Sequence, residues 1–422
     1  MRRIVTLLLM TLLAAFAWGE AAGAQETVDV RASDARSDFP NGIVFTLNAA
    51  SDAGFDEIRL VYEIAPDGVP TSAVAECTGG NVVNCSFQLS ASRRNLLIPA
   101  AQVTYFWRMT VSGVTEESDP QLVTYDDDRF DWQQVSDGNL TLWWYQGGED
   151  EARRVLAAGR ETLDGIGSLL QVSVDFPVRI IYYGSAQDMQ AAIISDNSEG
   201  VITLGEVVYS DTAMVSADAA PEEIARHEVA HIVVRQAVAG PYGLPDWLNE
   251  GTAVFAQSQP LGNQSQALEL AIQSGQVFSV RSLSSASSGS QAGTVSLFYG
   301  QSWSLVDFLI ETYGEEKFAQ LFQTFKEGAR TGDALEQVYG FDQDGLENAW
   351  RESVGLPPRQ EPTPDTERVP STPSSSPDPD SESTSDGDDG VSVALIVAIA
   401  VLTALLAGGL VGAGVIVARR YR

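Results

Sequence analysis

Two histidines and a glutamate near the middle of the chain have the spacing of a metal-binding helix. The segment reads His227-Glu228-Val229-Ala230-His231, and it holds the only two histidines among the 422 residues. Residues four apart share one face of a helix, so both imidazoles can bind a single ion. Glu228 then lies beside that ion, where a carboxylate can accept a proton. The sequence therefore predicts a metal-dependent site with His227 and His231 as ligands and Glu228 as general base.

The residues around this motif predict the helix that must carry it. Pro221 is suited to the first position of a helix, and Glu222 and Glu223 follow in the first turn. Gly240-Pro241 is a typical stop signal. We expect one helix from residue 221 that ends before residue 240.

A second segment supplies a candidate third ligand. It reads Leu244-Pro245-Asp246-Trp247-Leu248-Asn249-Glu250-Gly251-Thr252-Ala253, and eighteen residues separate His231 from Glu250. The pattern resembles the gluzincin superfamily of zinc metallopeptidases, and Trp-Leu-Asn-Glu-Gly is similar to its aminopeptidase N and peptidase MA-like branches. The resemblance implies an α+β zincin-like fold in which a second helix presents Glu250 to Zn²⁺. Two histidines and a glutamate with one open position are typical of catalytic zinc; the other interpretation of Glu250 is a solvated surface residue.

The resemblance covers about residues 130–356 and includes Phe298-Tyr299-Gly300-Gln301-Ser302-Trp303. By similarity to peptidase MA-like proteins, Tyr299 is expected to face the metal and donate a hydrogen bond to the oxyanion of the tetrahedral intermediate. Tyr299 is alternatively a core aromatic residue, and Tyr209 and Tyr242 are alternatives for the same role. The chain has no Gly-Ala-Met-Glu-Asn-like segment, with which aminopeptidase N relatives hold a free amino terminus. The resemblance therefore favours an endopeptidase acting on peptides or proteins.

Two other functions are compatible with the same motifs. A catalytically inactive zincin-like ectodomain could serve as an adhesion or binding module, although such a module has no need of Glu228. Zinc hydrolases also use the activated water on bonds other than peptides, and the sequence does not choose among these substrates.

The first part of the chain has the pattern of an all-β sandwich. Short apolar or alternating runs are separated by Gly, Pro, Asn and Asp, as in strands joined by turns. The aromatic run Thr104-Tyr105-Phe106-Trp107-Arg108 resembles a strand of fibronectin type III or immunoglobulin-like modules. Cys77 and Cys85 are the only cysteines, and in an exported protein a local disulfide is expected, with free thiols as the alternative. The expected strands cover residues 43–47, 57–64, 83–89, 103–111 and 121–125.

After the acidic run at residues 126–128 the pattern changes to mixed helix and strand. Residues 140–145 and 177–183 are expected to form strands, and residues 149–170 an amphipathic helix between them. This alternation indicates a second domain of the α+β class.

Both ends of the chain predict export and membrane attachment. Two arginines precede an apolar run and a small-residue cleavage site, as in a secretory signal peptide. Residues 391–417 are uncharged and apolar over a length that spans a bilayer, and the arginines that follow favour the cytoplasmic side. We therefore expect a single-pass cell-membrane protein whose catalytic ectodomain lies outside.

The net charge limits the possible binding partners, and the segments together give the expected order of domains. A net charge of −32 argues against nucleic-acid binding, because phosphate contacts need clustered Lys and Arg. The Pro, Ser and Asp-rich region before the apolar segment cannot bury enough surface to fold and is expected to be a disordered stalk. The expected parts are a signal peptide (1–24), a β-sandwich (25–126), a gluzincin-like metallopeptidase domain (127–356), the stalk (357–390), a transmembrane helix (391–418) and a basic cytoplasmic tail (419–422).

Overall fold

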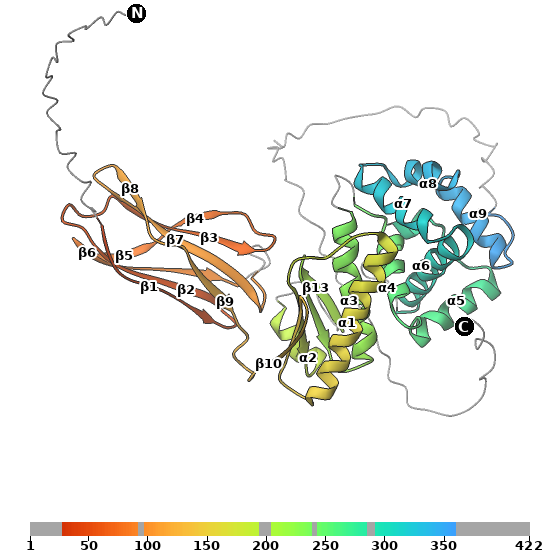
Figure 1. The fold of residues 1–422 in the computed structure, drawn as a ribbon, viewed down its shortest axis with the longest axis horizontal. Helices are drawn as coiled ribbons and strands as arrows, with labels where there is room; N and C mark the ends of the chain where they lie inside the picture. The colour runs from red at the N-terminus through yellow and green to blue at the C-terminus, as the bar shows by residue number, and fades with distance from the viewer. Residues whose placement is uncertain (1–27, 92–96, 194–203, 239–242, 285–291, 360–422) are drawn as a thin grey trace, which may run out of the picture. The chain divides into compact units, whose positions relative to one another are not determined.

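The computed structural model of the protein describes residues 28–91, 97–193, 204–238, 243–284 and 292–359. The expected signal peptide, transmembrane helix, cytoplasmic tail and residues 360–390 of the expected stalk lie outside these ranges. No helix within the ranges is both long and apolar enough to cross a bilayer. The contacts divide the chain into two units, Met1–Ser90 with Gln102–Thr124, and Ala91–Ala101 with Tyr125–Arg422 (Figure 1).

The first unit consists of two antiparallel sheets, which confirms the predicted N-terminal all-β region. One sheet has the order β1-β2-β6-β5, and the other has the order β4-β3-β7-β8 with β9 paired to β7. Phe45 of β2 and Tyr105 of β7 meet edge to face with ring centroids 4.8 Å apart, so the inner faces of the two sheets pack together. The strands are β1 (Asp29–Asp38), β2 (Gly42–Ala50), β3 (Glu57–Ala65), β4 (Thr71–Val74), β5 (Glu76–Gly79), β6 (Val82–Ser90), β7 (Ala101–Val111), β8 (Val114–Glu117) and β9 (Gln121–Tyr125).

A disulfide joins Cys77 of β5 to Cys85 of β6, as predicted. The two residues are directly opposite each other in the antiparallel pair. The bond therefore ties the short edge strand β5 to its neighbour.

The second unit is built on a mixed five-stranded sheet with the order β10-β11-β12-β14-β13. The three central strands are parallel, and β10 and β13 pair with them antiparallel at the two edges. All six residues of β12 are buried, as expected for a central strand covered on both faces. The strands are β10 (Gln133–Asp137), β11 (Leu140–Trp144), β12 (Val178–Tyr183), β13 (Gly205–Tyr209) and β14 (Thr212–Ser216).

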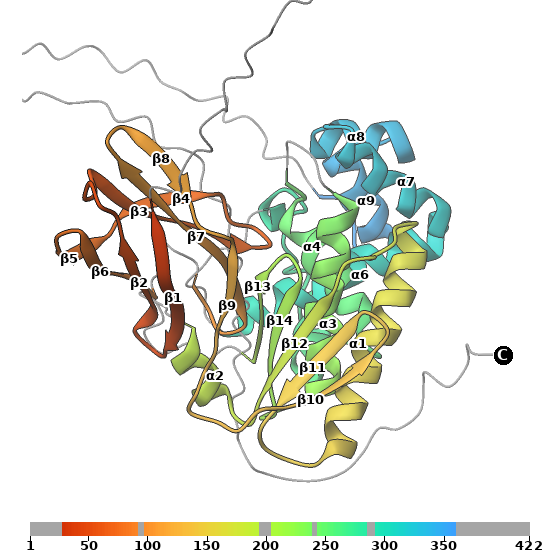
Figure 2. The same ribbon diagram turned by 60° about the vertical axis from the view of Figure 1, so that its left-hand side comes forward.

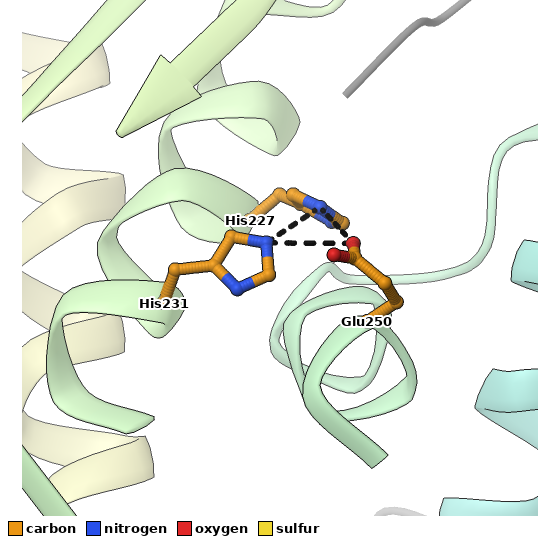
Figure 3. A group of neighbouring side chains, drawn as sticks. All are labelled: His227, His231 and Glu250. Atoms are coloured by element: carbon orange, nitrogen blue, oxygen red, sulfur yellow. Dashed lines mark hydrogen bonds and ion pairs between the residues drawn. The ribbon is translucent and has the colours of Figure 1, made fainter. Parts of the chain in front are cut away.

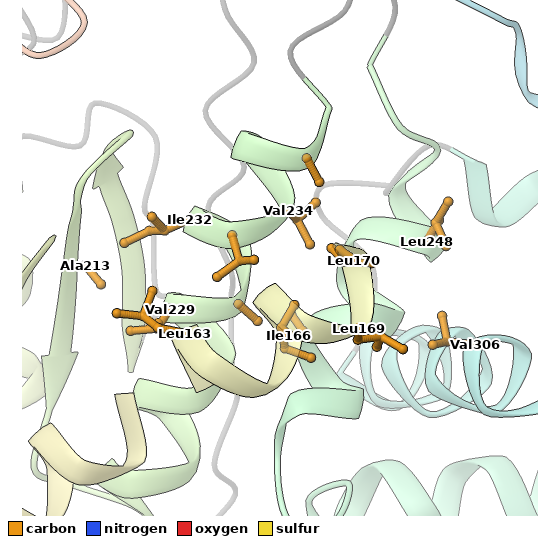
Figure 4. Close-up of a cluster of buried hydrophobic side chains, with 14 of the residues drawn as sticks. Leu163, Ile166, Leu169, Leu170, Ala213, Val229, Ile232, Val234, Leu248 and Val306 are labelled. Atoms are coloured by element: carbon orange, nitrogen blue, oxygen red, sulfur yellow. The ribbon is translucent and has the colours of Figure 1, made fainter. Parts of the chain in front are cut away.

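Helices α1 (Glu149–Leu170) and α3 (Pro221–Ala237) pack on this sheet and on each other. Gly159 of α1 permits the close approach, because a β-carbon there would lie 2.9 Å from the side chain of Ile180 and 3.5 Å from that of Val229. Figure 4 shows Leu163, Val229 and Val306 among the side chains that α1, α3 and α6 contribute to one buried cluster. The core of the second unit therefore fixes α3, the helix of the histidine motif, against the sheet.

The remaining helices complete the second unit, and α7, α8 and α9 gather at one end of it (Figure 2). Trp350 of α9 is fully buried, and its indole N–H donates to the Ser304 hydroxyl of α6 at 3.0 Å. The helices are α2 (Ala186–Ala192), α4 (Asp246–Ala256), α5 (Gly262–Ser274), the 3-10 turn η1 (Ser282–Ser284), α6 (Ala292–Tyr313), α7 (Glu315–Lys326), α8 (Thr331–Tyr339) and α9 (Gln343–Ser353).

Candidate metal centre

Helix α3 carries the histidine motif as the sequence predicts. Pro221 occupies its first turn together with Glu222 and Glu223, and Arg235 lies in its last turn. This distribution suits the helix dipole, which is positive at the N-terminus and negative at the C-terminus. The helix positions His227 and His231 one turn apart on the same side, and His227 is only 4% exposed.

Helix α4 brings Glu250 to the two imidazoles. It begins directly after Pro245, and Glu250 lies one turn into it with 1% of its surface exposed. One carboxylate oxygen of Glu250 (Oε2) is 3.4 Å from Nε2 of His227 and 3.5 Å from Nε2 of His231. The two Nε2 atoms are 3.2 Å apart, and Figure 3 shows all three groups pointing toward one another. The interpretation of Glu250 as a solvated surface residue is therefore wrong.

The triangle formed by these three atoms fits a zinc ion. Tetrahedral zinc with Zn–N and Zn–O distances near 2.0–2.2 Å separates its ligand atoms by roughly 3.3–3.5 Å. The observed edges are 3.2, 3.4 and 3.5 Å. Oε2 of Glu250 is buried and has no hydrogen-bond partner among the described residues. The donor set and its spacing are thus those of a three-ligand metal site.

The charges at this site also favour a cation. Burial raises the pKa of Glu250, but the charge of His231 and the close approach of both imidazoles outweigh it and lower that pKa to about 2. Burial lowers the pKa of His227, which favours its neutral imidazole. Burial also acts to lower the pKa of His231, yet the neighbouring carboxylates of Glu250 and Glu228 raise it to about 9. An ionised carboxylate and a strong preference for positive charge are the properties a cation-binding site needs.

Glu228 lies beside the three ligands on α3 and is 1% exposed. Burial raises the pKa of its carboxyl to about 8, and Glu250 and Glu206 add to the rise, while His231 opposes it. Its Oε2 atom has no hydrogen-bond partner in the described part of the chain. A carboxyl group with a pKa near neutrality can both accept and donate a proton.

Asn249 is a site residue that the sequence reasoning did not single out. Its side-chain oxygen lies 3.0 Å from Nδ1 of His231, and its amide nitrogen lies 3.4 Å from the other oxygen of Glu250. A histidine ligand that donates its second N–H to such an oxygen keeps its lone pair on the opposite nitrogen. Asn249 therefore contacts two of the three candidate ligands, and its position directly before Glu250 in the sequence was the available signal.

Tyr299 of α6 lies near the same cluster. Its ring centroid is 6.0 Å from that of His227 at an interplanar angle of 68°, and the residue is 7% exposed. Burial raises its pKa well above the usual value, and Glu250, Glu228 and Asp246 contribute in the same direction. The side chain is therefore a neutral hydroxyl next to the ligands.

The two rival tyrosines have different positions. The Tyr209 hydroxyl accepts a hydrogen bond from the Ile98 backbone N–H at 2.9 Å and is thus engaged with that segment. Tyr242 lies outside the described residues. The structure therefore brings Tyr299 to the cluster and gives Tyr209 a backbone partner.

The second unit thus combines a mixed sheet, a helix that carries His227, Glu228 and His231, and a following helix that carries Glu250. Residues 160–355 match the family model of the Peptidase MA superfamily, which places a domain of that superfamily in this part of the chain. This match supports a peptidase-like function at the level of the superfamily.

Comparison with curated proteins finds no match. Among solved structures, the chain is similar to an aminopeptidase N family protein from Idiomarina loihiensis, with 10% identity, a TM-score of 0.33 and 74% of each chain covered. It is also similar to a GH family 64 laminaripentaose-producing β-1,3-glucanase from Paenibacillus barengoltzii, with 16% identity and a TM-score of 0.16. That match covers 29% of this chain and 28% of the glucanase chain. At these TM-scores neither structure informs the function.

Proposed function

We propose that the protein is a zinc-dependent endopeptidase in which His227, His231 and Glu250 hold the metal and Glu228 is the general base. The observation that carries the proposal is the triangle of three potential ligand atoms, from His227, His231 and Glu250, with edges of 3.2–3.5 Å. The Peptidase MA superfamily match over residues 160–355 supports peptide bonds as the target.

The metal contributes one kind of chemistry to this mechanism. A zinc ion held by the three ligands would act as a Lewis acid and lower the pKa of a coordinated water toward about 7. The other contributions come from side chains of this chain.

Glu228 accepts the proton of the attacking water and later donates it to the leaving amine. Its buried carboxyl has a pKa raised to about 8, and a cation beside it would favour the ionised form that the first of these steps needs. The same side chain can then return the proton to the leaving amine. Proton transfer by one well-placed group typically contributes about 10²- to 10⁴-fold in rate.

Tyr299 donates its hydroxyl proton in a hydrogen bond to the oxyanion of the tetrahedral intermediate. The raised pKa keeps the hydroxyl protonated over the whole neutral range, as a donor must be. Its ring centroid lies 6.0 Å from that of His227, which places the side chain beside the proposed ligands.

The edge strand β13 supports an extended peptide as the substrate. Its register places it beside β14, and within the described sheet it has a neighbour on one side only. An extended peptide can add to such an edge through main-chain hydrogen bonds. Because Gly205 of β13 lies against Glu228, a peptide paired there would be close to the general base.

The location and cleavage mode belong to the same proposal. The segments at residues 1–24 and 391–418 support a single-pass membrane protein with its catalytic domain outside the cell. The absence of a Gly-Ala-Met-Glu-Asn-like segment from the sequence supports internal cleavage over removal of the first residue.

The function is tested by peptide-library profiling of the zinc-loaded protein, with the Glu228→Gln variant measured alongside for comparison. We expect the wild type to cleave internal bonds and a chelator to stop it. The variant should keep one zinc per chain by elemental analysis and lose at least about 10²-fold in kcat. Zinc binding without any hydrolysis by the wild type would instead support the inactive binding module.

A further inference from the structure

The backbone of β13 lies directly against the side chain of the proposed general base. Gly205 is the first residue of β13, and its partner in the sheet is Val215 of β14. A β-carbon at Gly205 would lie 2.6 Å from Oε1 and 2.9 Å from Cγ of Glu228. It would also lie 2.5 Å from Cγ2 of Ile224, one turn earlier on α3. The contact therefore joins the edge strand to the catalytic face of the helix.

Glycine is required here by space and not by conformation. The backbone of Gly205 is outside the left-handed region that favours glycine, so any residue could adopt its φ. Contacts below 3.0 Å are essentially never made by real β-carbons, and ordinary contact begins near 3.4 Å. One methyl group would thus require a shift of about 1 Å in whatever faces it.

Glu228 is the neighbour whose displacement would matter for chemistry. It is 1% exposed, so its carboxylate is confined by the surrounding protein. One oxygen faces Gly205, while the other oxygen has no hydrogen-bond partner among the described residues. The backbone of Gly205 therefore limits where the first of these oxygens can lie.

We propose that Gly205 is a positioning residue. Because it has no β-carbon, it leaves room for the Glu228 carboxylate and determines the position of that carboxylate relative to the proposed metal ligands. This inference rests on the proposed function of Glu228. It assigns a role to a residue of the edge strand that is neither a ligand nor a proton carrier.

The first test is the kinetics of Gly205→Ala in the full chain. A displacement of about 1 Å at a reacting group costs roughly 10²-fold in rate. We expect kcat to fall by about 10- to 100-fold, with KM within twofold and one zinc per chain retained. Gly332→Ala in α8 is the matched control, because a β-carbon there meets nothing within 4 Å. Equal kcat values for Gly205→Ala and the wild type would overturn the proposal, whereas an inactive wild type would overturn the proposed function itself.

The second test uses thermal stability and does not depend on activity. Overpacking by one methyl group should lower Tm by about 2–8 °C in the wild-type background. Glu228→Ala removes both clashing atoms of that residue, so in this background Gly205→Ala should lower Tm by clearly less than in the wild type, and the remaining contact with Cγ2 of Ile224 accounts for the rest of the loss. If Gly205→Ala alone does not fold, recovery of the folded protein by Glu228→Ala supports the same conclusion.

The Ile224→Ala variant shows which of the two neighbours of Gly205, Ile224 or Glu228, causes the loss of Tm. Relief of the Tm loss by Glu228→Ala supports the proposal. If only Ile224→Ala relieves it, or if neither does, Gly205 serves core packing alone and the proposal is wrong.

Discussion

The side-chain oxygen of Asn249 lies 3.0 Å from Nδ1 of His231, whereas the other ring nitrogen, Nε2, lies 3.2 Å from Nε2 of His227. The same amide reaches toward Glu250, the ligand next to it in the chain. Asn249 thus links the two helices that carry the proposed ligands.

Replacing Asn249 by Ala should weaken zinc binding. Loss of such a partner typically lowers metal affinity by about 10- to 100-fold, because the imidazole is no longer held in orientation and tautomer. Zinc Kd values measured with a competing chelator check this. Asn249→Asp keeps an acceptor oxygen and should retain most of the affinity; unchanged binding by Asn249→Ala would contradict the role.

Replacing Tyr299 by Phe should lower kcat without loss of metal. Removal of one oxyanion donor typically costs about 10²- to 10³-fold in kcat. The matched control is Tyr209→Phe, which removes a hydroxyl bonded to the Ile98 backbone. That change should cost about 0.5–1.5 kcal/mol of stability and leave kcat nearly unchanged. If Tyr209→Phe lowers kcat and Tyr299→Phe does not, the assignment of Tyr299 as the oxyanion donor is wrong.

Replacing Gly251 by Ala should disturb the packing of α4 on α6. A β-carbon there would lie 2.4 Å from the Ser302 carbonyl oxygen and 2.8 Å from a methyl group of Val306. Because the nearest atom belongs to the backbone, the helices must separate, at a cost of about 1–3 kcal/mol. Denaturant unfolding measures this, and Gly332→Ala in an open position serves as control. A weaker zinc affinity is also expected, since Glu250 precedes Gly251; equal stability of the two variants would refute the close contact.

Zinc should stabilise the folded protein. An ion that binds only the native site at 1,000 times its Kd adds about 4 kcal/mol to the free energy of unfolding. Chelation should therefore lower Tm, and the shift should disappear in His227→Ala, which lacks one ligand. A chelator effect of the same size in that variant would indicate a metal site elsewhere.

Much of the fold follows from local sequence signals. The helix predicted over residues 149–170 is α1, with the same bounds, because its apolar stripe and acidic first turn are strong signals. The helix predicted from residue 221 is α3, which ends at Ala237. By contrast, β1 was not predicted, because its ten residues are mostly exposed and carry charged side chains without an apolar alternation. Short strands such as β13 and β14 depend on their neighbours in the sheet and leave little trace in the sequence.

The site shows the same division. His227, Glu228 and His231 follow from spacing on one helix, and Glu250 and Tyr299 were implied by the family resemblance. Asn249 and Gly205 were not predicted. The role of Asn249 becomes visible only when the distance between α3 and α4 is known, and that of Gly205 only when the contact between β13 and the Glu228 side chain is known. The periodic pattern of apolar residues within one helix or strand does not reveal contacts between elements that are distant in sequence.

The most direct measurement is a crystal structure of the zinc-loaded protein with anomalous data collected at the zinc edge. We expect one strong peak about 2.0–2.2 Å from Nε2 of His227, Nε2 of His231 and a carboxylate oxygen of Glu250. A peak absent from this triangle in protein that binds stoichiometric zinc, or present with Glu250 turned away from it, would contradict the account.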